Sequence, residues 1–201
     1  WVVWKKGSKS HRQIFKKILI FIFVKLLKIL MTNKLIIKTP EEIKCSLEEI
    51  SKQIKERYNK EPLDLVSMNS AARYLVEDIK ELLDMDIRYQ NLIFESYKSP
   101  TKSGEVHITQ DLKLPIFNRH IILVDGIIVS GITHNYLISS LMQRLPKSIS
   151  ILSIGIKPYL LKYKLPKCFS LFEFNEEWVE GYGIGEGIYS SKNYLVDLNK
   201  S

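Results

Sequence analysis

Apolar residues recur at helical spacing after residue 39 and predict the first helix of the chain. Thr39 and Pro40 supply an N-cap hydroxyl and a proline at the first helical position. The intervals of three and four residues place the apolar side chains on one face, up to about Tyr58. The side chains with this spacing are Ile43, Leu47, Ile50 and Ile54. We therefore predict an amphipathic helix over 40–58.

The rest of the chain alternates short apolar runs with two further helical patterns. The helical patterns cover Ala71–Leu83 and Thr133–Arg144. Strands separated by helices favour a parallel sheet, so we predict an α/β fold with a mainly parallel sheet flanked by helices. The runs that predict strands are Leu63–Met68, Ile87–Phe94, His120–Val124, Ile149–Ile156 and Phe169–Phe174.

Residues 1–30 differ from the rest of the chain because they are basic, then apolar, and contain no acidic residue. The apolar run from Ile18 to Leu30 is shorter than the about 20 residues that span a bilayer, and Lys25 and Lys28 interrupt it. No small-residue cleavage site of a secretory signal follows. We expect a folded domain over 31–201 that starts at Met31, with an interfacial anchor or targeting segment over 1–30 as the alternative.

Composition indicates one globular domain. The chain has 201 residues, 45% of them hydrophobic, and only two cysteines, which excludes a disulfide framework. The net charge of +8 comes from residues 1–30, because acids and bases are equal in number beyond them. A nucleic-acid binder needs a basic surface. We expect a cytoplasmic protein whose domain has no nucleic-acid or membrane partner.

The segment HIILVDGIIVSGIT over 120–133 admits two interpretations. Asp125 and Gly126 between apolar runs are typical of a β-hairpin with a type I′ turn. Alternatively, a buried strand gives way after Val124 to a loop that leads into a helix capped by Thr133. Such a loop would present backbone amides and hydroxyls to a phosphate group.

In the second interpretation, the segment resembles the phosphoribosyl-pyrophosphate signature of type I phosphoribosyltransferases. In that signature a strand delivers two acids, then two apolar residues, an acid, and a small-residue phosphate loop ending in Gly-x-Thr. Four more segments between Leu63 and Asp197 resemble the hypoxanthine/guanine phosphoribosyltransferase family in order and spacing. They are the pyrophosphate turn at Met68-Asn69-Ser70-Ala71, the mobile loop Ser96–Gly104 with its Ser96-Tyr97 pair, Lys157 after a strand, and Trp178–Gly183.

The resemblance implies the fold of that family, with a small hood formed by the terminal segments, and a homodimer or homotetramer. It implies phosphoribosyl pyrophosphate, a 6-oxopurine or purine nucleotide, and Mg²⁺ as ligands. The residues that it assigns to the 5′-phosphate are Ser130, Gly131, Ile132 and Thr133. Those that it assigns to pyrophosphate are Asn69, Ser70 and Ala71, and those for the purine are Lys157, Trp178 and Val179. Asp125 and Glu186 are the metal candidates.

Three positions depart from the family pattern where the reaction needs a carboxylate. The acidic pair of the family falls on Asp125 and Gly126, its proton-handling Asp falls on Val129, and its metal-holding Asp falls on Gly185. A positioned acid or base contributes roughly 10²- to 10⁴-fold to a rate. We therefore expect a purine salvage phosphoribosyltransferase with reduced or lost activity.

Two alternatives stay open at this point. One is a catalytically silent protein that binds purine nucleotide or phosphoribosyl pyrophosphate as a regulator, or that pairs with an active paralogue. The other is a decaying gene product with neither role, which the Ser70-Ala71 pair favours because the pyrophosphate turn of the family has Gly-Gly there.

Overall fold

The core of the protein is a five-stranded parallel sheet, as the computed structural model shows for residues 34–59, 61–68, 72–96 and 106–200. The strand order is β3-β2-β6-β7-β8, and every neighbouring pair is parallel. The strands are β2 (Leu63–Ser67), β3 (Ile87–Asn91), β6 (His120–Ile128), β7 (Ser148–Ile156) and β8 (Cys168–Glu173). The predicted α/β class is confirmed.

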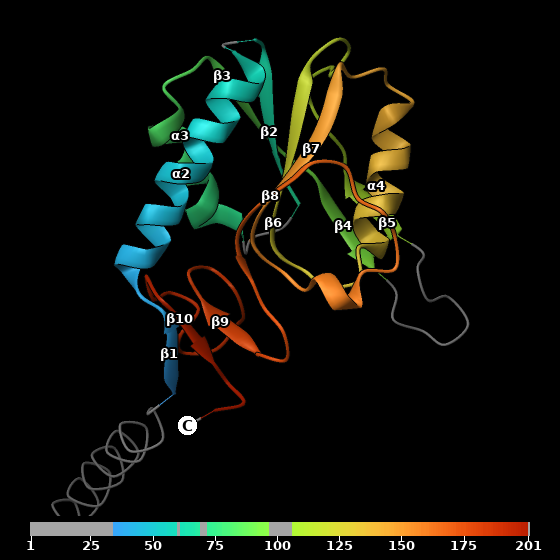
Figure 1. Ribbon diagram of the computed structural model, residues 1–201. Coiled ribbons are helices and arrows are strands. Elements are labelled where there is room, and N and C mark those ends of the chain that lie inside the picture. Colours follow the sequence, from blue (N-terminus) through green and yellow to red (C-terminus); the bar gives the residue numbers. More distant parts are fainter. Residues whose placement is uncertain (1–33, 60, 69–71, 97–105, 201) are drawn as a thin grey trace, which may run out of the picture.

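Helices cover both faces of this sheet (Figure 1). α2 (Pro40–Tyr58) and α3 (Arg73–Leu83) pack on one face, and α4 (Ile132–Met142) packs on the other. Successive side chains of β6 point to opposite faces of the sheet. Ile122 packs in the core beneath α2 and α3, whereas Leu123 packs in the core beneath α4. The continuous apolar run of β6 therefore marks a strand that is buried on both sides.

Helix α2 begins where its capping residues predict. The Thr39 hydroxyl accepts the N–H of Glu42, and the Glu42 carboxylate accepts the N–H of Thr39 at 2.9 Å, which completes a capping box. Asn59 ends the helix in the left-handed conformation. The prediction of a helix over 40–58 is confirmed.

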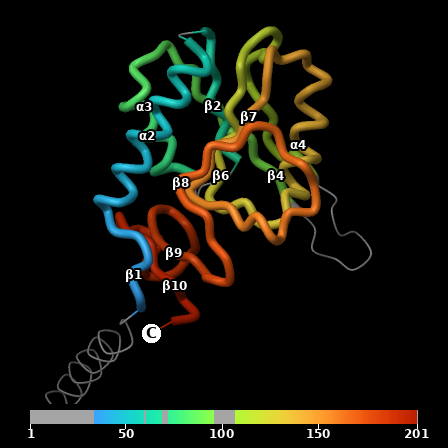
Figure 2. The backbone as a smooth tube through the Cα atoms, in the orientation of Figure 1, coloured from blue at the N-terminus to red at the C-terminus, as the bar shows by residue number. Residues whose placement is uncertain are grey.

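A small antiparallel sheet forms the hood from both terminal parts of the described chain (Figure 2). Its order is β1 (Leu35–Lys38), β10 (Leu195–Asp197) and β9 (Val179–Gly181). A separate antiparallel pair joins β4 (Ile93–Ser96) and β5 (Val106–Gln110). The predicted hood of terminal segments is thus present beside the sheet.

Two predicted strand boundaries are wrong. Ile87–Phe94 is two strands, because the backbone breaks at Leu92 and β4 leaves the main sheet to pair with β5. The strand predicted to end at Val124 continues as β6 to Ile128, in parallel register with β7. The hairpin interpretation of this segment is wrong for the same reason, since Asp125 and Gly126 lie inside the strand.

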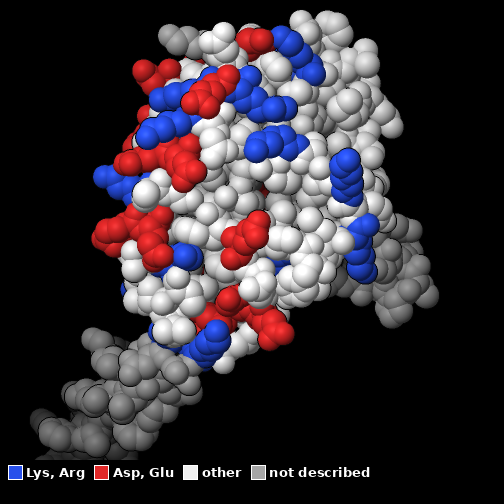
Figure 3. Space-filling model, in the orientation of Figure 1, with Lys and Arg blue, Asp and Glu red and all other residues white. Residues whose placement is uncertain are grey.

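Basic and acidic side chains are interspersed over the face seen in Figure 3. On α3, Arg73 pairs with Glu77 one helical turn away at 3.0 Å. No helix among the described residues is long and apolar enough to cross a membrane. The predictions for residues 1–30, for Asn69, Ser70 and Ala71, and for Tyr97 lie outside the described residues.

Candidate active site

The link between β6 and α4 forms a compact loop at the carboxyl end of the sheet. β6 ends at Ile128, residues 129 and 130 bend, and Gly131 adopts φ +71° immediately before the first residue of α4. The first amides of a helix have no acceptor within the helix and carry the positive end of its dipole. The loop therefore offers amides that suit a phosphate group.

Gly131, and not Thr133, is the N-cap of α4. Gly131 is in the left-handed conformation that favours glycine, and its carbonyl accepts the N–H of Asn135 at 2.9 Å. Thr133 is already the second residue of the helix. The prediction that Thr133 caps the helix is wrong, although Thr133 does lie in the first turn, whose amides face the loop.

Contacts with the segment that follows β7 fix the conformation of the loop. The carbonyl of Ser130 accepts the N–H of Lys162 at 3.0 Å, and the Ser130 hydroxyl accepts the N–H of Ile132 at 3.4 Å. A Cβ at Gly131 would lie 3.3 Å from a methyl group of Leu165. The loop thus has one defined shape, set by the segment that follows β7.

Asp125 carries the carboxylate that β6 brings to this loop. It is 8% exposed, and its Oδ1 atom accepts the N–H of Gly126 at 2.7 Å. Its Oδ2 atom lies 3.1 Å from Nε2 of His134, which is 4% exposed on the first turn of α4. Sequence reasoning missed this histidine, although its place directly after Thr133 puts it on the turn that follows the loop.

The two other acid positions of the family hold residues without a proton acceptor. Gly126 is buried within β6, and Val129 is 44% exposed at the bend after the strand. Because Val129 is exposed, its side chain contributes little hydrophobic stabilisation. Over residues 125–133 the chain therefore has one acidic side chain, that of Asp125.

Lys157 and Trp178 are joined through the residue that precedes the tryptophan. Lys157 is half-buried, and its Nζ atom donates to the carbonyl of Glu177 at 2.7 Å. Trp178 is 67% exposed, and its backbone is held by Asp197, whose Oδ1 atom accepts the Trp178 N–H at 3.0 Å. A place in the core is excluded for Trp178. Val179 is buried in β9 and faces Asp197 across the hood sheet.

A buried carboxylate occupies the glycine-rich turn of the hood. Glu180 is 5% exposed, and its Oε1 atom accepts the N–H of Tyr189 at 3.3 Å. A Cβ at Gly185 would lie 2.7 Å from Cγ of Glu180. Glu186, the metal candidate of the sequence, is exposed. The carboxylate of Glu180 therefore lies beside position 185, although no sequence pattern singled it out.

No group of three or more His, Cys, Asp or Glu side chains able to hold a metal occurs in the part of the chain that the structure describes. Asp125 is the one predicted metal candidate that lies at the loop. Mg²⁺ is commonly held by one or two carboxylates together with substrate phosphates. A single carboxylate at the loop is therefore compatible with a metal ion whose other oxygen ligands come mainly from the phosphates of a bound ligand.

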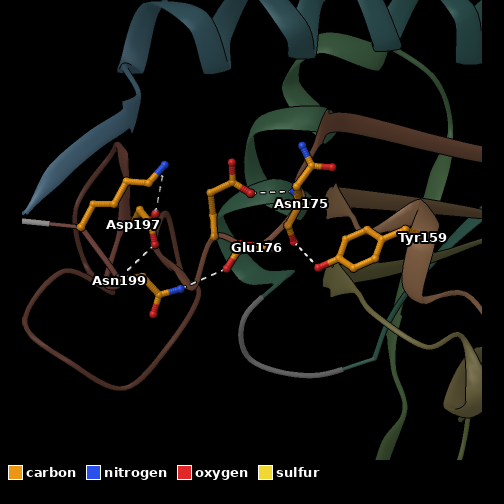
Figure 4. Close-up of a pocket in the computed structure, with 7 residues that line it drawn as sticks. Tyr159, Asn175, Glu176, Asp197 and Asn199 are labelled. Carbon is orange, nitrogen blue, oxygen red and sulfur yellow. Dashed lines mark hydrogen bonds and ion pairs between the residues drawn. The ribbon is translucent and has the colours of Figure 1, made fainter.

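A cavity of about 580 Å³ lies beside the segment that precedes Trp178 (Figure 4). Residues 175–177, which lead to Trp178, form part of its wall, and Tyr159 on the same wall donates to the carbonyl of Asn175 at 2.6 Å. None of the sequence-predicted site residues lines it. The lining residues are Tyr159, Asn175, Glu176, Glu177, Asp197, Asn199 and Lys200.

Comparisons with known proteins agree with this architecture. No family model matches the chain. The hypoxanthine-guanine phosphoribosyltransferase of Bacillus subtilis is 32% identical over 149 residues, which are 72% of this chain and 81% of that protein. The enzyme of the same name from Mycobacterium tuberculosis strain H37Rv is 26% identical over 174 residues, 83% of this chain and 86% of that one. The crystal structure of a hypoxanthine phosphoribosyltransferase from Staphylococcus aureus superposes with a TM-score of 0.78 at 25% identity, covering 84% of this chain and 94% of that one.

Proposed function

The chain belongs to the hypoxanthine-guanine phosphoribosyltransferase family of purine salvage, and from this premise we propose that it binds a 5′-phosphoribosyl ligand and a 6-oxopurine but transfers the phosphoribosyl group slowly or not at all. The observation that carries the proposal is the contrast at the end of β6. The loop places Gly131 as the N-cap of α4, where the first amides of the helix can meet a phosphate, while Gly126 and Val129 provide no carboxylate.

The phosphate end of the ligand is assigned to Ser130, Gly131, Ile132 and Thr133. Their amides lie at the N-terminus of α4, where the helix dipole favours an anion. Binding of this kind needs backbone geometry rather than acidic side chains. The lost acids therefore leave the phosphate contact in place.

The purine is assigned to Lys157, Trp178 and Val179. The lysine ammonium has three N–H donors, of which one is used on the Glu177 carbonyl, so it keeps donors for a 6-oxo group. Adenine offers an amino group instead, which would leave a donor unmatched. The exposed indole of Trp178 offers a face on which a base can stack.

The transfer reaction forms a bond between a purine nitrogen and the anomeric carbon while pyrophosphate leaves that carbon. The purine gives up a ring proton, and the valine at position 129 cannot accept it. The ribose hydroxyls and the positive charge that develops on the sugar are left with one carboxylate, that of Asp125. Loss of a positioned base alone costs roughly 10²- to 10⁴-fold in rate.

We propose that Mg²⁺ binds together with the pyrophosphate group of the ligand. When bound there it would neutralise the charge of the leaving group. Asp125 is the residue that we assign to it, with Glu186 as the second candidate, and the phosphates would supply the other oxygen ligands.

The test is the initial rate of nucleotide formation by the full chain with hypoxanthine or guanine, phosphoribosyl pyrophosphate and Mg²⁺. The matched variant is Gly126→Asp with Val129→Asp, because Gly126 lies in extended strand backbone that accepts any residue. We expect a slow rate or none for the unmodified chain and a clearly higher rate for the double variant. A rate in the ordinary enzyme range of about 1–10³ s⁻¹ for the unmodified chain would contradict the proposal.

A second candidate function is a silent member of the family that binds nucleotide as a regulator or as the partner of an active paralogue. The intact phosphate loop beside a missing proton acceptor favours it. Tight binding of GMP or phosphoribosyl pyrophosphate, together with a double variant that stays inactive, would support this candidate over a slow enzyme.

A further inference from the structure

A buried carboxylate lines the cavity beside the segment that precedes Trp178. Asp197 is 1% exposed, and its Oδ1 atom accepts the N–H groups of Trp178 and Asn199, each at 3.0 Å. Its Oδ2 atom is buried and has no hydrogen-bond donor among the residues that the structure describes. A buried carboxylate oxygen without a donor is costly, so a donor brought by a ligand would stabilise it.

The ammonium group of Lys200 lies near this oxygen without forming a hydrogen bond. Its Nζ atom is 3.9 Å from Asp197 Oδ2, which is within the range of an ion pair but beyond that of a hydrogen bond. The Lys200 side chain is 61% exposed, so little packing is lost when it turns away. Both residues line the cavity, and an ammonium group that enters the cavity can therefore take the place of that of Lys200.

The wall of the cavity is richer in acceptors than in donors. The hydroxyl of Tyr159 is used on the carbonyl of Asn175 at 2.6 Å, and the side-chain amide of Asn199 is used on the carbonyl of Glu176 at 3.0 Å (Figure 4). Three of the four charged residues on the described wall are acidic, which favours a ligand with positive charge and N–H donors. These four are Glu176, Glu177, Asp197 and Lys200.

The three acids of the wall suit an organic cation better than a metal ion. They do not form a group able to hold a metal, since no such group of three occurs among the described residues. The volume of about 580 Å³ lies in the range of small-molecule sites. Acids and bases are equal in number beyond residue 30, so the acidic wall is a local feature of a formally neutral domain.

We propose that this cavity binds an aliphatic polyamine, with one ammonium group on Asp197 Oδ2 and another beside Glu176. Separate ammonium groups on a slender chain match acids that are spread over the wall. The inference does not rest on the proposed function, because none of residues 129–133 lines the cavity. The ligand would lie next to the segment that carries the exposed indole, since Asp197 also holds the Trp178 N–H.

The probe is spermidine, titrated into the full chain by calorimetry at pH 7 without nucleotide or Mg²⁺. We expect saturable binding of spermidine, and binding of butylamine, which has one ammonium group, that is weaker by at least about fivefold. Asp197→Asn keeps an acceptor for the two main-chain N–H groups but replaces Oδ2 by an amide nitrogen. Its affinity for spermidine should be lower by roughly 10- to 100-fold.

Two further variants test the assignment of charges. Lys200→Met removes the competing ammonium group and should raise the affinity for spermidine by roughly fivefold. Glu49→Gln, at an exposed acid of α2, is the control for weak binding to surface acids and should leave the affinity unchanged.

The proposal is overturned if the wild type shows no saturable binding, because water then satisfies Asp197. Equal affinity in the wild type and Asp197→Asn, or equal affinity for spermidine and butylamine, overturns it as well. Binding by Lys200→Met alone would make Lys200 the natural occupant and would also overturn it. Thermal unfolding shows whether Asp197→Asn folds. If it does not, Glu176→Gln at an exposed position decides, with an expected loss of roughly fivefold, and unchanged affinity there overturns the proposal.

Discussion

The Nζ atom of Lys157 donates a hydrogen bond to the main-chain oxygen of Glu177 at 2.7 Å. Lys157 follows the last residue of β7, and Glu177 precedes Trp178 at the entrance to the hood. The bond thus sets the position of the exposed indole relative to the end of the sheet. It also holds the ammonium group at the place where the proposal puts the oxygen of a purine.

Replacement of Lys157 by alanine is expected to weaken binding of GMP by roughly 10- to 100-fold, because hydrogen bonds to charged groups are worth about 1.5–3 kcal/mol. Calorimetric titration of the full chain with GMP measures this. Lys162→Ala is the matched control, since Lys162 is an exposed lysine whose backbone N–H holds the phosphate loop. Unchanged affinity in Lys157→Ala would show that the base lies elsewhere.

Tyr182 connects the hood to α3 and is expected to make the protein sensitive to alkali. Its hydroxyl donates to the carboxylate of Asp78, and its ring stacks on Tyr74 with centroids 5.9 Å apart. Burial raises the pKa of Tyr182 well above its ordinary value, and the bond to Asp78 raises the pKa further. The unfolded chain therefore loses this proton at about pH 10, whereas the folded chain keeps it.

The sign of the effect follows from the raised pKa of Tyr182. Protonated Tyr182 contributes its full share to the free energy of unfolding below about pH 10. Above that pH the contribution decreases, and at pH 11 the free energy of unfolding is lower by about 1.4 kcal/mol. Urea unfolding at pH 8 and pH 11 should show that loss in the wild type and not in Tyr182→Phe. Tyr163→Phe, at an exposed tyrosine, is the control and should behave as the wild type does. An equal loss in Tyr182→Phe would contradict the assignment.

The main elements could be predicted because their signals are local. The cap at Thr39 and the apolar runs of β6 and β7 predict a helix and buried strands without reference to the rest of the chain. The hood strands could not be predicted in the same way, since β9 and β10 have only three residues each and form by pairing with each other across a long loop.

The error at Asp125 and Gly126 has a tertiary cause. The Asp-Gly pair favours a turn locally, but the pairing of β6 with β7 continues through it to Ile128. His134, which lies outside the strand on the first turn of α4, approaches the Asp125 carboxylate to 3.1 Å. Contacts of this kind, like that of Glu180 with the glycine-rich turn, depend on which elements meet, and one sequence does not reveal them.

Gly181 is expected to be essential for the hood. Its φ is +117°, and a Cβ there would lie 2.0 Å from the carbonyl oxygen of Tyr194 on the neighbouring segment. The clash involves backbone on both sides, so it cannot be relieved by a side-chain rotation. Gly181→Ala should lower the free energy of unfolding by about 3 kcal/mol.

Urea unfolding at pH 7, followed by tryptophan fluorescence, measures the effect of Gly181→Ala. Ser191→Ala at an exposed position of the same segment is the control and should change the free energy of unfolding by less than about 0.5 kcal/mol. Similar values for the two variants would mean that β9 and β10 separate without loss of stability.

Asp64 is expected to contribute to stability far more than an exposed acid that is also paired with arginine. Its side chain is 0% exposed on β2 and accepts hydrogen bonds from Arg88 at 2.5 and 2.9 Å and from Arg119 at 2.6 Å. Asp64→Asn would leave the partly buried guanidinium groups of Arg88 and Arg119 beside a neutral amide, at a cost of about 3 kcal/mol.

The matched comparison is Asp111→Asn. Asp111 pairs with Arg144 at 2.7 Å, but its side chain is 51% exposed, so solvent screens the pair and its loss should cost at most about 1 kcal/mol. Urea unfolding at pH 7 measures the free energy of unfolding of both variants. Asp64→Asn should lower that free energy much more than Asp111→Asn does. Equal losses would mean that burial adds nothing to the pairing of Asp64. In that case the end of the sheet opposite the phosphate loop would owe its stability to apolar packing alone.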